Sequence, residues 1–95
     1  MTTGTNLSSE GLDPRRRRLL FRCWHRGIRE MDLVLGRFAD TQLASLADHE
    51  LDELERWLDV PDQQIFAWVN GMEPVPATYN TALFHQLRDF HKGVP

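Results

Sequence analysis

Apolar residues recur along this chain at the three- and four-residue spacing that places side chains on one face of a helix. We predict that the first helix begins at Asp13-Pro14, because an acid caps a helix well and proline suits its first position. Its apolar stripe consists of Leu20, Cys23, Trp24 and Gly27. Gly27 lies where this helix is expected to end, since glycine tolerates the left-handed backbone that closes many helices.

Four more helices are predicted by the same spacing. We expect them at about residues 28–38, 48–59, 61–70 and 78–91, with a connection at 40–46 and a stiff linker at 73–76. No segment alternates apolar and polar residues as a half-buried strand does. Short helices with one apolar face each can hide those faces only against one another. The sequence therefore predicts an all-α fold, a small five-helix bundle in which Trp68 is buried.

The length of the chain, 95 residues, suits a single domain with one modest core. Residues 1–12 are polar and lack periodicity, so we expect a disordered tail followed by one helical domain at 13–93. No run approaches the roughly 20 apolar residues that a membrane span needs. The start resembles neither a signal peptide nor an arginine-rich transit peptide, which favours a bacterial cytoplasmic protein.

Charge is distributed unevenly along the sequence. Residues 14–37 hold eight arginines and two acids, a balance of +6, whereas residues 38–95 hold three basic residues and ten acids, a balance of −7. A molecule with two electrically different ends is expected to present one of them to a partner.

Little in the sequence indicates catalysis. The four histidines form no metal-binding pair, and motifs for phosphate loops or serine nucleophiles are absent. The lone cysteine, Cys23, falls on the apolar face of the first helix, where a small filler side chain is the simplest role. We therefore expect no enzyme, no metal site and no stably bound cofactor.

The arginine run at residues 15–18 has two interpretations. Adjacent helical residues point in different directions, so most of the run can simply be solvated. Alternatively it marks an anionic partner, either an acidic protein surface or nucleic acid. A sequence pI of about 5.7 and the ten acids of the second half weigh against nucleic acid. A small DNA-binding regulator remains the alternative from a different class.

The segment RGIREMD, residues 26–32, concentrates charge beside a glycine. The spacings of Arg26 to Glu30 and of Arg29 to Asp32 let opposite charges meet on a helix, yet exposed pairs of this kind contribute only about 0.2–0.5 kcal/mol each. Stability is thus a poor reason for the cluster. On a partner surface the same groups can form charge-assisted hydrogen bonds, and the glycine lets another backbone come close.

RGIREMD resembles the RGxxE signature of the succinate dehydrogenase assembly factor 2 family, also called the FAD assembly factor SdhE or flavinator. The resemblance covers about residues 14–93 and includes several further segments. These are RRRRLLFRCWHRG upstream, LVLGRF after the signature, ERWLDVPD, IFAWVNGMEPVP and LRDFHKG. The family implies a five-helix bundle, which agrees with the periodicity.

The resemblance also implies a function. Family members bind the flavoprotein subunit of succinate dehydrogenase, and in some bacteria that of fumarate reductase, and promote covalent attachment of FAD to a histidine of that subunit. FAD is then a group attached to the partner, and the factor acts as a chaperone, without nucleic acid, membrane insertion or a second copy of itself. Carried over by position, the partner-binding residues are Arg26, Gly27 and Glu30, with Ile28, Asp32 and Arg18 beside them. A helical interaction module for another partner is the main alternative.

Overall fold

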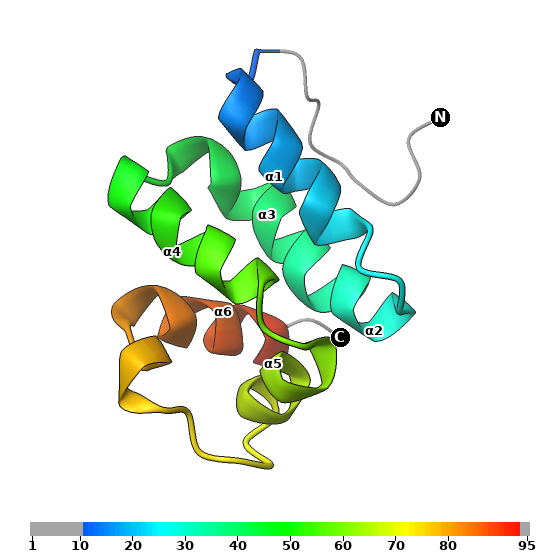
Figure 1. Ribbon diagram of the computed structural model, residues 1–95, viewed down its shortest axis with the longest axis vertical. Helices are drawn as coiled ribbons and strands as arrows, with labels where there is room; N and C mark the ends of the chain where they lie inside the picture. Colours follow the sequence, from blue (N-terminus) through cyan, green and yellow to red (C-terminus); the bar gives the residue numbers. More distant parts are fainter. Residues whose placement is uncertain (1–10, 94–95) are drawn as a thin grey trace.

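The computed structural model describes residues 11–93 and confirms the predicted all-α fold. In this range the chain forms α1 (Pro14–Trp24), α2 (Arg29–Met31), η1 (Asp32–Gly36), α3 (Arg37–Gln42), α4 (Asp48–Leu58), α5 (Asp62–Val69) and α6 (Ala82–Lys92). Because α2, η1 and α3 follow one another without a break, they form one helix, and the bundle has five (Figure 1). The predicted tail lies outside the described residues over 1–10, while Leu12 packs against the core.

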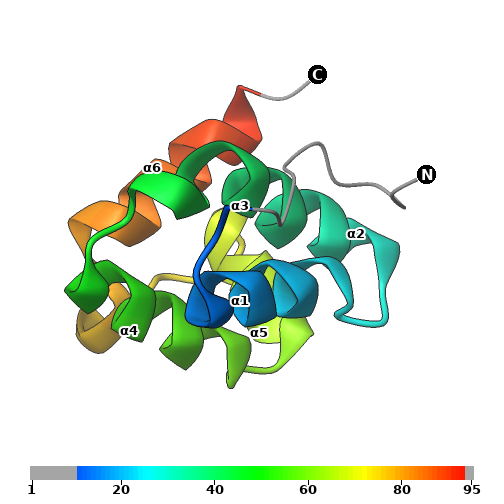
Figure 2. The same cartoon turned by 90° about the horizontal axis from the view of Figure 1, so that it is seen from above.

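The helices are arranged around one core. α1 packs against η1, α3 and α4, whereas α6 packs against α3 and α5 (Figures 1 and 2). Two 3₁₀ turns, η2 (Leu43–Ser45) and η3 (Ala77–Tyr79), shape the connections that lead into α4 and α6. Figure 2 places α1 and α6 on opposite sides of α3. In the described part of the chain, no helix has the length and apolar character needed to cross a bilayer.

Aromatic rings form the centre of the core. Trp57 is fully buried and meets Phe84 edge to face, with ring centroids 5.6 Å apart, a geometry that aromatic pairs favour. Trp68 is buried as predicted and packs against both Phe84 and Tyr79. Cys23 is also fully buried, which confirms its role as a small apolar filler.

Three predicted helix boundaries are wrong by a few residues. The first helix ends at Trp24, three residues before Gly27, and the second continues to Gln42, into the first three residues of the expected connection at 40–46. The last helix begins at Ala82 because the hydroxyl of Thr81 accepts a hydrogen bond from the Phe84 N–H at 3.2 Å, the bond that a helix cap supplies. Tyr79 consequently lies in η3 and not on the last helix.

A π-helical turn, η1, interrupts the second helix opposite Trp24. Gly36, at the end of this turn, is buried, and a Cβ atom there would overlap the indole ring of Trp24. The indole Nε1–H donates to a carboxylate oxygen of Asp40 at 3.0 Å. Glycine at this position therefore lets α1 approach the second helix closely, with the Trp24 ring lying between them.

The charge asymmetry of the sequence serves the fold itself. Ion pairs join the arginine-rich α1 and its C-terminal extension to acids of the second half: Arg15 to Asp52 and Glu55, Arg22 to Asp59, and Arg26 to Asp62. The two differently charged ends of the sequence thus bind each other. Because these charges pair within the fold, the uneven charge distribution is weaker evidence for a partner than the sequence alone suggested.

Candidate functional site

The turn between α1 and the second helix, together with the first residues of that helix (residues 26–30), forms a corner at the right-hand edge of the molecule in Figure 1. The chain leaves α1 at His25, adopts a left-handed conformation at Gly27 with φ of +96°, and is extended at Ile28 before the helix restarts at Arg29. Gly27 is therefore the left-handed glycine predicted from the sequence. A side chain in this conformation costs about 1–2 kcal/mol, which explains why glycine occupies the position.

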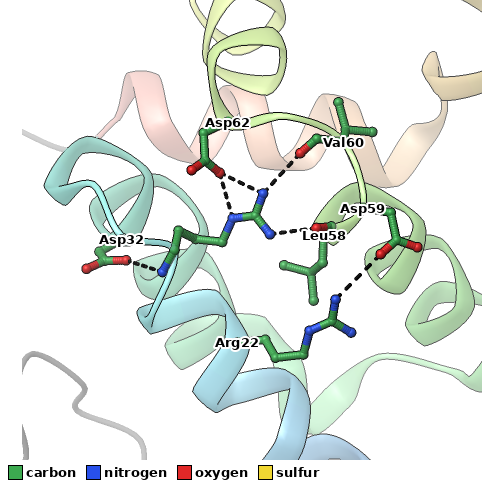
Figure 3. Close-up of polar contacts among 7 residues, drawn as sticks. Arg22, Asp32, Leu58, Asp59, Val60 and Asp62 are labelled. Atoms are coloured by element: carbon green, nitrogen blue, oxygen red, sulfur yellow. Dashed lines mark hydrogen bonds and ion pairs between the residues drawn. The ribbon is translucent and has the colours of Figure 1, made fainter.

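The Arg26 guanidinium bonds to the segment that joins α4 to α5. Its partners there, Leu58, Val60 and Asp62, are labelled in Figure 3. Its Nε donates to a carboxylate oxygen of Asp62 at 2.7 Å, its Nη1 to the Leu58 carbonyl at 2.6 Å and its Nη2 to the Val60 carbonyl at 3.0 Å. Only 13% of the side chain is exposed. Hydrogen bonds from a guanidinium to a carboxylate are among the stronger ones in proteins, so Arg26 fastens the corner to the end of α4.

The sequence spacing suggested an ion pair between Arg26 and Glu30, and this prediction is wrong. The partner of Arg26 is Asp62, which lies 36 residues away. Asp32 also serves the corner from within, because its half-buried carboxylate accepts a hydrogen bond from the backbone N–H of Arg26 at 3.0 Å. The structure thus brings Arg26 and Asp32 together as the inner framework of the corner.

The outer side of the corner consists of Gly27, Ile28, Arg29 and Glu30, all of which are exposed. Ile28 is 43% exposed, and no atom lies within 4 Å of the position that a Cβ of Gly27 would occupy. The side chains of Arg29 and Glu30 make no hydrogen bond or ion pair with any other described residue. This outer side presents a cation, an anion, an apolar side chain and bare backbone, and neither charged side chain is engaged by another described residue.

Arg18 lies apart from the corner. It is exposed on α1, seven residues before His25 and thus about 10 Å along the helix axis. It lines a shallow surface hollow together with Arg17, Phe21 and Arg22. Phe21, which the apolar spacing did not single out, is 61% exposed. Its position beside Leu20, just off the apolar stripe of α1, could have indicated an outward-facing aromatic ring.

Groups that could carry out chemistry are scarce around the corner. Burial raises the pKa of the nearby Cys23 thiol to about 12, and the charges of Arg26 and Arg22 lower it only in part. A thiol in this state is a poor nucleophile at neutral pH. Within residues 11–93, no group of three or more His, Cys, Asp or Glu side chains is placed to hold a metal ion. The arrangement suits recognition of another surface.

Comparison with known proteins identifies relatives. The family model described as flavinator of succinate dehydrogenase matches residues 17–91. An FAD assembly factor SdhE from Acetobacter pasteurianus is 30% identical over 86 residues, which cover 90% of this chain and 79% of that protein.

Two mitochondrial proteins named succinate dehydrogenase assembly factor 2 are also similar. The one from Mycosarcoma maydis is 42% identical over 85 residues, 83% of this chain and 36% of the relative. The one from Debaryomyces hansenii is 43% identical over 83 residues, 84% of this chain and 58% of the relative. This chain therefore spans only about a third to somewhat more than half of these longer relatives.

Proposed function

Because the chain belongs to the family of succinate dehydrogenase flavinators, we propose that it binds the flavoprotein subunit of succinate dehydrogenase and promotes covalent attachment of FAD to that subunit. Members of this family are assembly factors and not catalysts. On this proposal a histidine of the target and the flavin supply the reacting atoms. The factor contributes by holding the target in the conformation in which those atoms meet.

One observation supports the corner as the docking site. Gly27, Ile28, Arg29 and Glu30 are exposed, while Arg26 and Asp32 fix the backbone beneath them with four charge-assisted hydrogen bonds. A preformed surface loses less conformational entropy on binding than a flexible loop does. We therefore assign direct contact with the target to Gly27, Ile28 and Glu30, and a positioning role to Arg26 and Asp32.

The test measures covalent flavin on the target in cells. A host strain that lacks this factor is complemented with the wild-type chain, with Gly27→Arg or with Glu30→Ala, and the flavoprotein subunit is scored by the fluorescence of its bound flavin in a denaturing gel. We expect both variants to give the low signal of the strain without the factor. Asp89→Asn, which changes an exposed carboxylate on α6, is the matched control and is expected to give the wild-type signal.

The variants are chosen so that a fold defect is visible. A Cβ atom at position 27 would meet open space, so the cost expected for Gly27→Arg is that of the left-handed backbone, about 1–2 kcal/mol. Circular dichroism and a thermal melt of each purified variant check that it is folded. Wild-type flavin fluorescence with both corner variants would refute the proposed site.

Three finer expectations accompany the proposal. The resemblance extends it to the flavoprotein subunit of fumarate reductase, which is scored in the same gel. Action as a monomer is checked by light scattering of the purified chain. A cytoplasmic location stays a prediction, because relatives with the FAD assembly factor name and relatives named as mitochondrial both resemble this chain.

A further inference from the structure

The run of four arginines at the start of α1 divides into two pairs with different roles. Arg15 forms ion pairs with Asp52 and Glu55 on α4, and Arg16 donates to the carbonyls of Leu43 and Leu46. Arg17 and Arg18 are exposed and make no side-chain hydrogen bond or ion pair with another described residue. Half of the run thus stabilises the fold, and the other half points into solvent.

An exposed aromatic pair lies beside these two free arginines. Phe21 and His25 stack with ring centroids 3.8 Å apart and planes 17° from parallel, and Nδ1 of His25 lies 2.7 Å from the Phe21 carbonyl oxygen. Phe21 is 61% exposed, so its ring contacts His25 while most of its surface faces solvent. The Phe21 ring is not part of the hydrophobic core, to which α1 contributes the buried residues Leu19, Leu20 and Cys23.

This aromatic and basic surface continues into the corner. Arg18, Phe21 and Arg22 lie at i, i+3 and i+4 on α1, which places them on one face. His25 follows directly after α1, and its ring joins this face by stacking on Phe21. His25 is followed directly by Arg26 and Gly27, and Figure 1 shows α1 running into that turn. A partner that contacts Ile28 and Glu30 can therefore also contact this face of α1.

Building on the proposed function, we propose that the face of α1 formed by Arg17, Arg18, Phe21 and His25 is a second part of the docking surface. This face would bind an apolar pocket, rimmed by carboxylates, on the same flavoprotein subunit. Exposed aromatic rings and arginines supply much of the energy of protein interfaces, because a flat ring fills a pocket and guanidinium groups bond carboxylates. The exposed Phe21 ring and the two free guanidiniums match a pocket of this character in shape and charge.

The test measures the affinity of the full-length chain for the purified flavoprotein subunit of succinate dehydrogenase. We expect Phe21→Ala to weaken binding by about tenfold or more, the loss typical of a central aromatic contact. The double variant Arg17→Glu, Arg18→Glu should weaken binding as much. Rising salt should weaken the binding of the wild type more steeply than the binding of a variant that carries Phe21→Ala together with both arginine substitutions. Lys92→Glu is the matched charge-reversal control and should bind like the wild type, because Lys92 is exposed on α6. Figure 2 places that helix on the far side of α3 from α1.

The possible outcomes distinguish failure of this inference from failure of the proposed function. Wild-type affinity in both α1 variants, together with loss of binding in Glu30→Ala, overturns this inference and leaves the proposed function intact. Absence of any binding by the wild-type chain overturns the proposed function itself. Retention of the wild-type chain on duplex DNA at low salt, lost in the arginine variant, would identify the surface as a nucleic-acid site and also overturn the inference. The replaced side chains are exposed, and circular dichroism confirms that each variant is folded.

Discussion

Removal of the Arg26 side chain tests whether this arginine holds the corner in place. In Arg26→Ala the carboxylate of Asp62 loses its ion pair, and the carbonyls of Leu58 and Val60 lose a charged donor. Breaking a fully buried ion pair costs about 3–5 kcal/mol, and each hydrogen bond to a charged group contributes about 1.5–3 kcal/mol. The side chain is 13% exposed and Asp62 22% exposed, so water recovers part of the loss, and we expect about 2–4 kcal/mol.

Urea unfolding followed by tryptophan fluorescence measures this loss. Arg22→Ala is the matched control, because Arg22 reaches Asp59 only at 3.6 Å and the two side chains are 47% and 81% exposed. Exposed pairs of this kind contribute about 0–1 kcal/mol, so the control should stay near the wild-type stability. Arg26→Lys should fall between the two, since an ammonium cannot supply the planar fork that reaches three acceptors. A free energy of unfolding for Arg26→Ala equal to that of Arg22→Ala would refute the role assigned to Arg26.

Three other predictions follow from the fold. Gly36→Ala should destabilise the chain by about 1–3 kcal/mol in urea unfolding, because its Cβ would overlap the Trp24 ring; an unchanged midpoint would contradict the close contact. The hydrogen bond from Arg15 holds the pKa of Glu55 below its ordinary value of 4.5, so the stability that Glu55 adds over Glu55→Gln should be present above about pH 5 and be lost as pH falls through the lowered pKa; a pH-independent difference would contradict this. Cys23, with a pKa raised to about 12 by burial, should be alkylated at pH 8 at least about a hundredfold more slowly in the native chain than in urea; equal rates would contradict its burial.

Much of the fold could be predicted because it depends on local rules. Apolar spacing identified the helices, and Gly27 was found because a glycine after a helical stripe is typical of a left-handed turn. Helix ends were less certain. The last helix was expected from about residue 78, whereas the hydrogen bond from the Phe84 N–H to the Thr81 hydroxyl shows that it begins at Ala82.

Features that depend on distant contacts could not be predicted. The partner of Arg26 lies 36 residues away, so the sequence spacing favoured Glu30 instead. The π-helical turn at Asp32–Gly36 coincides with the close packing of Trp24 on Gly36, a contact between two helices that spacing within one helix does not reveal. The charges beside Gly27 and the resemblance to a family both indicated the candidate site at the corner. The division into inner and outer residues came from the structure.

Site-specific photocrosslinking shows which side of the molecule touches the proposed target, the flavoprotein subunit of succinate dehydrogenase. A photoreactive phenylalanine analogue is placed at position 29, an exposed residue of the corner whose side chain has no polar partner among the described residues, or at Gln86, an exposed residue of α6. Each full-length chain is irradiated with that subunit, and Glu30 stays unchanged in both. We expect a covalent product of the two proteins from position 29 and none from position 86. Efficient crosslinking from position 86 with none from position 29 would contradict the corner as the docking site.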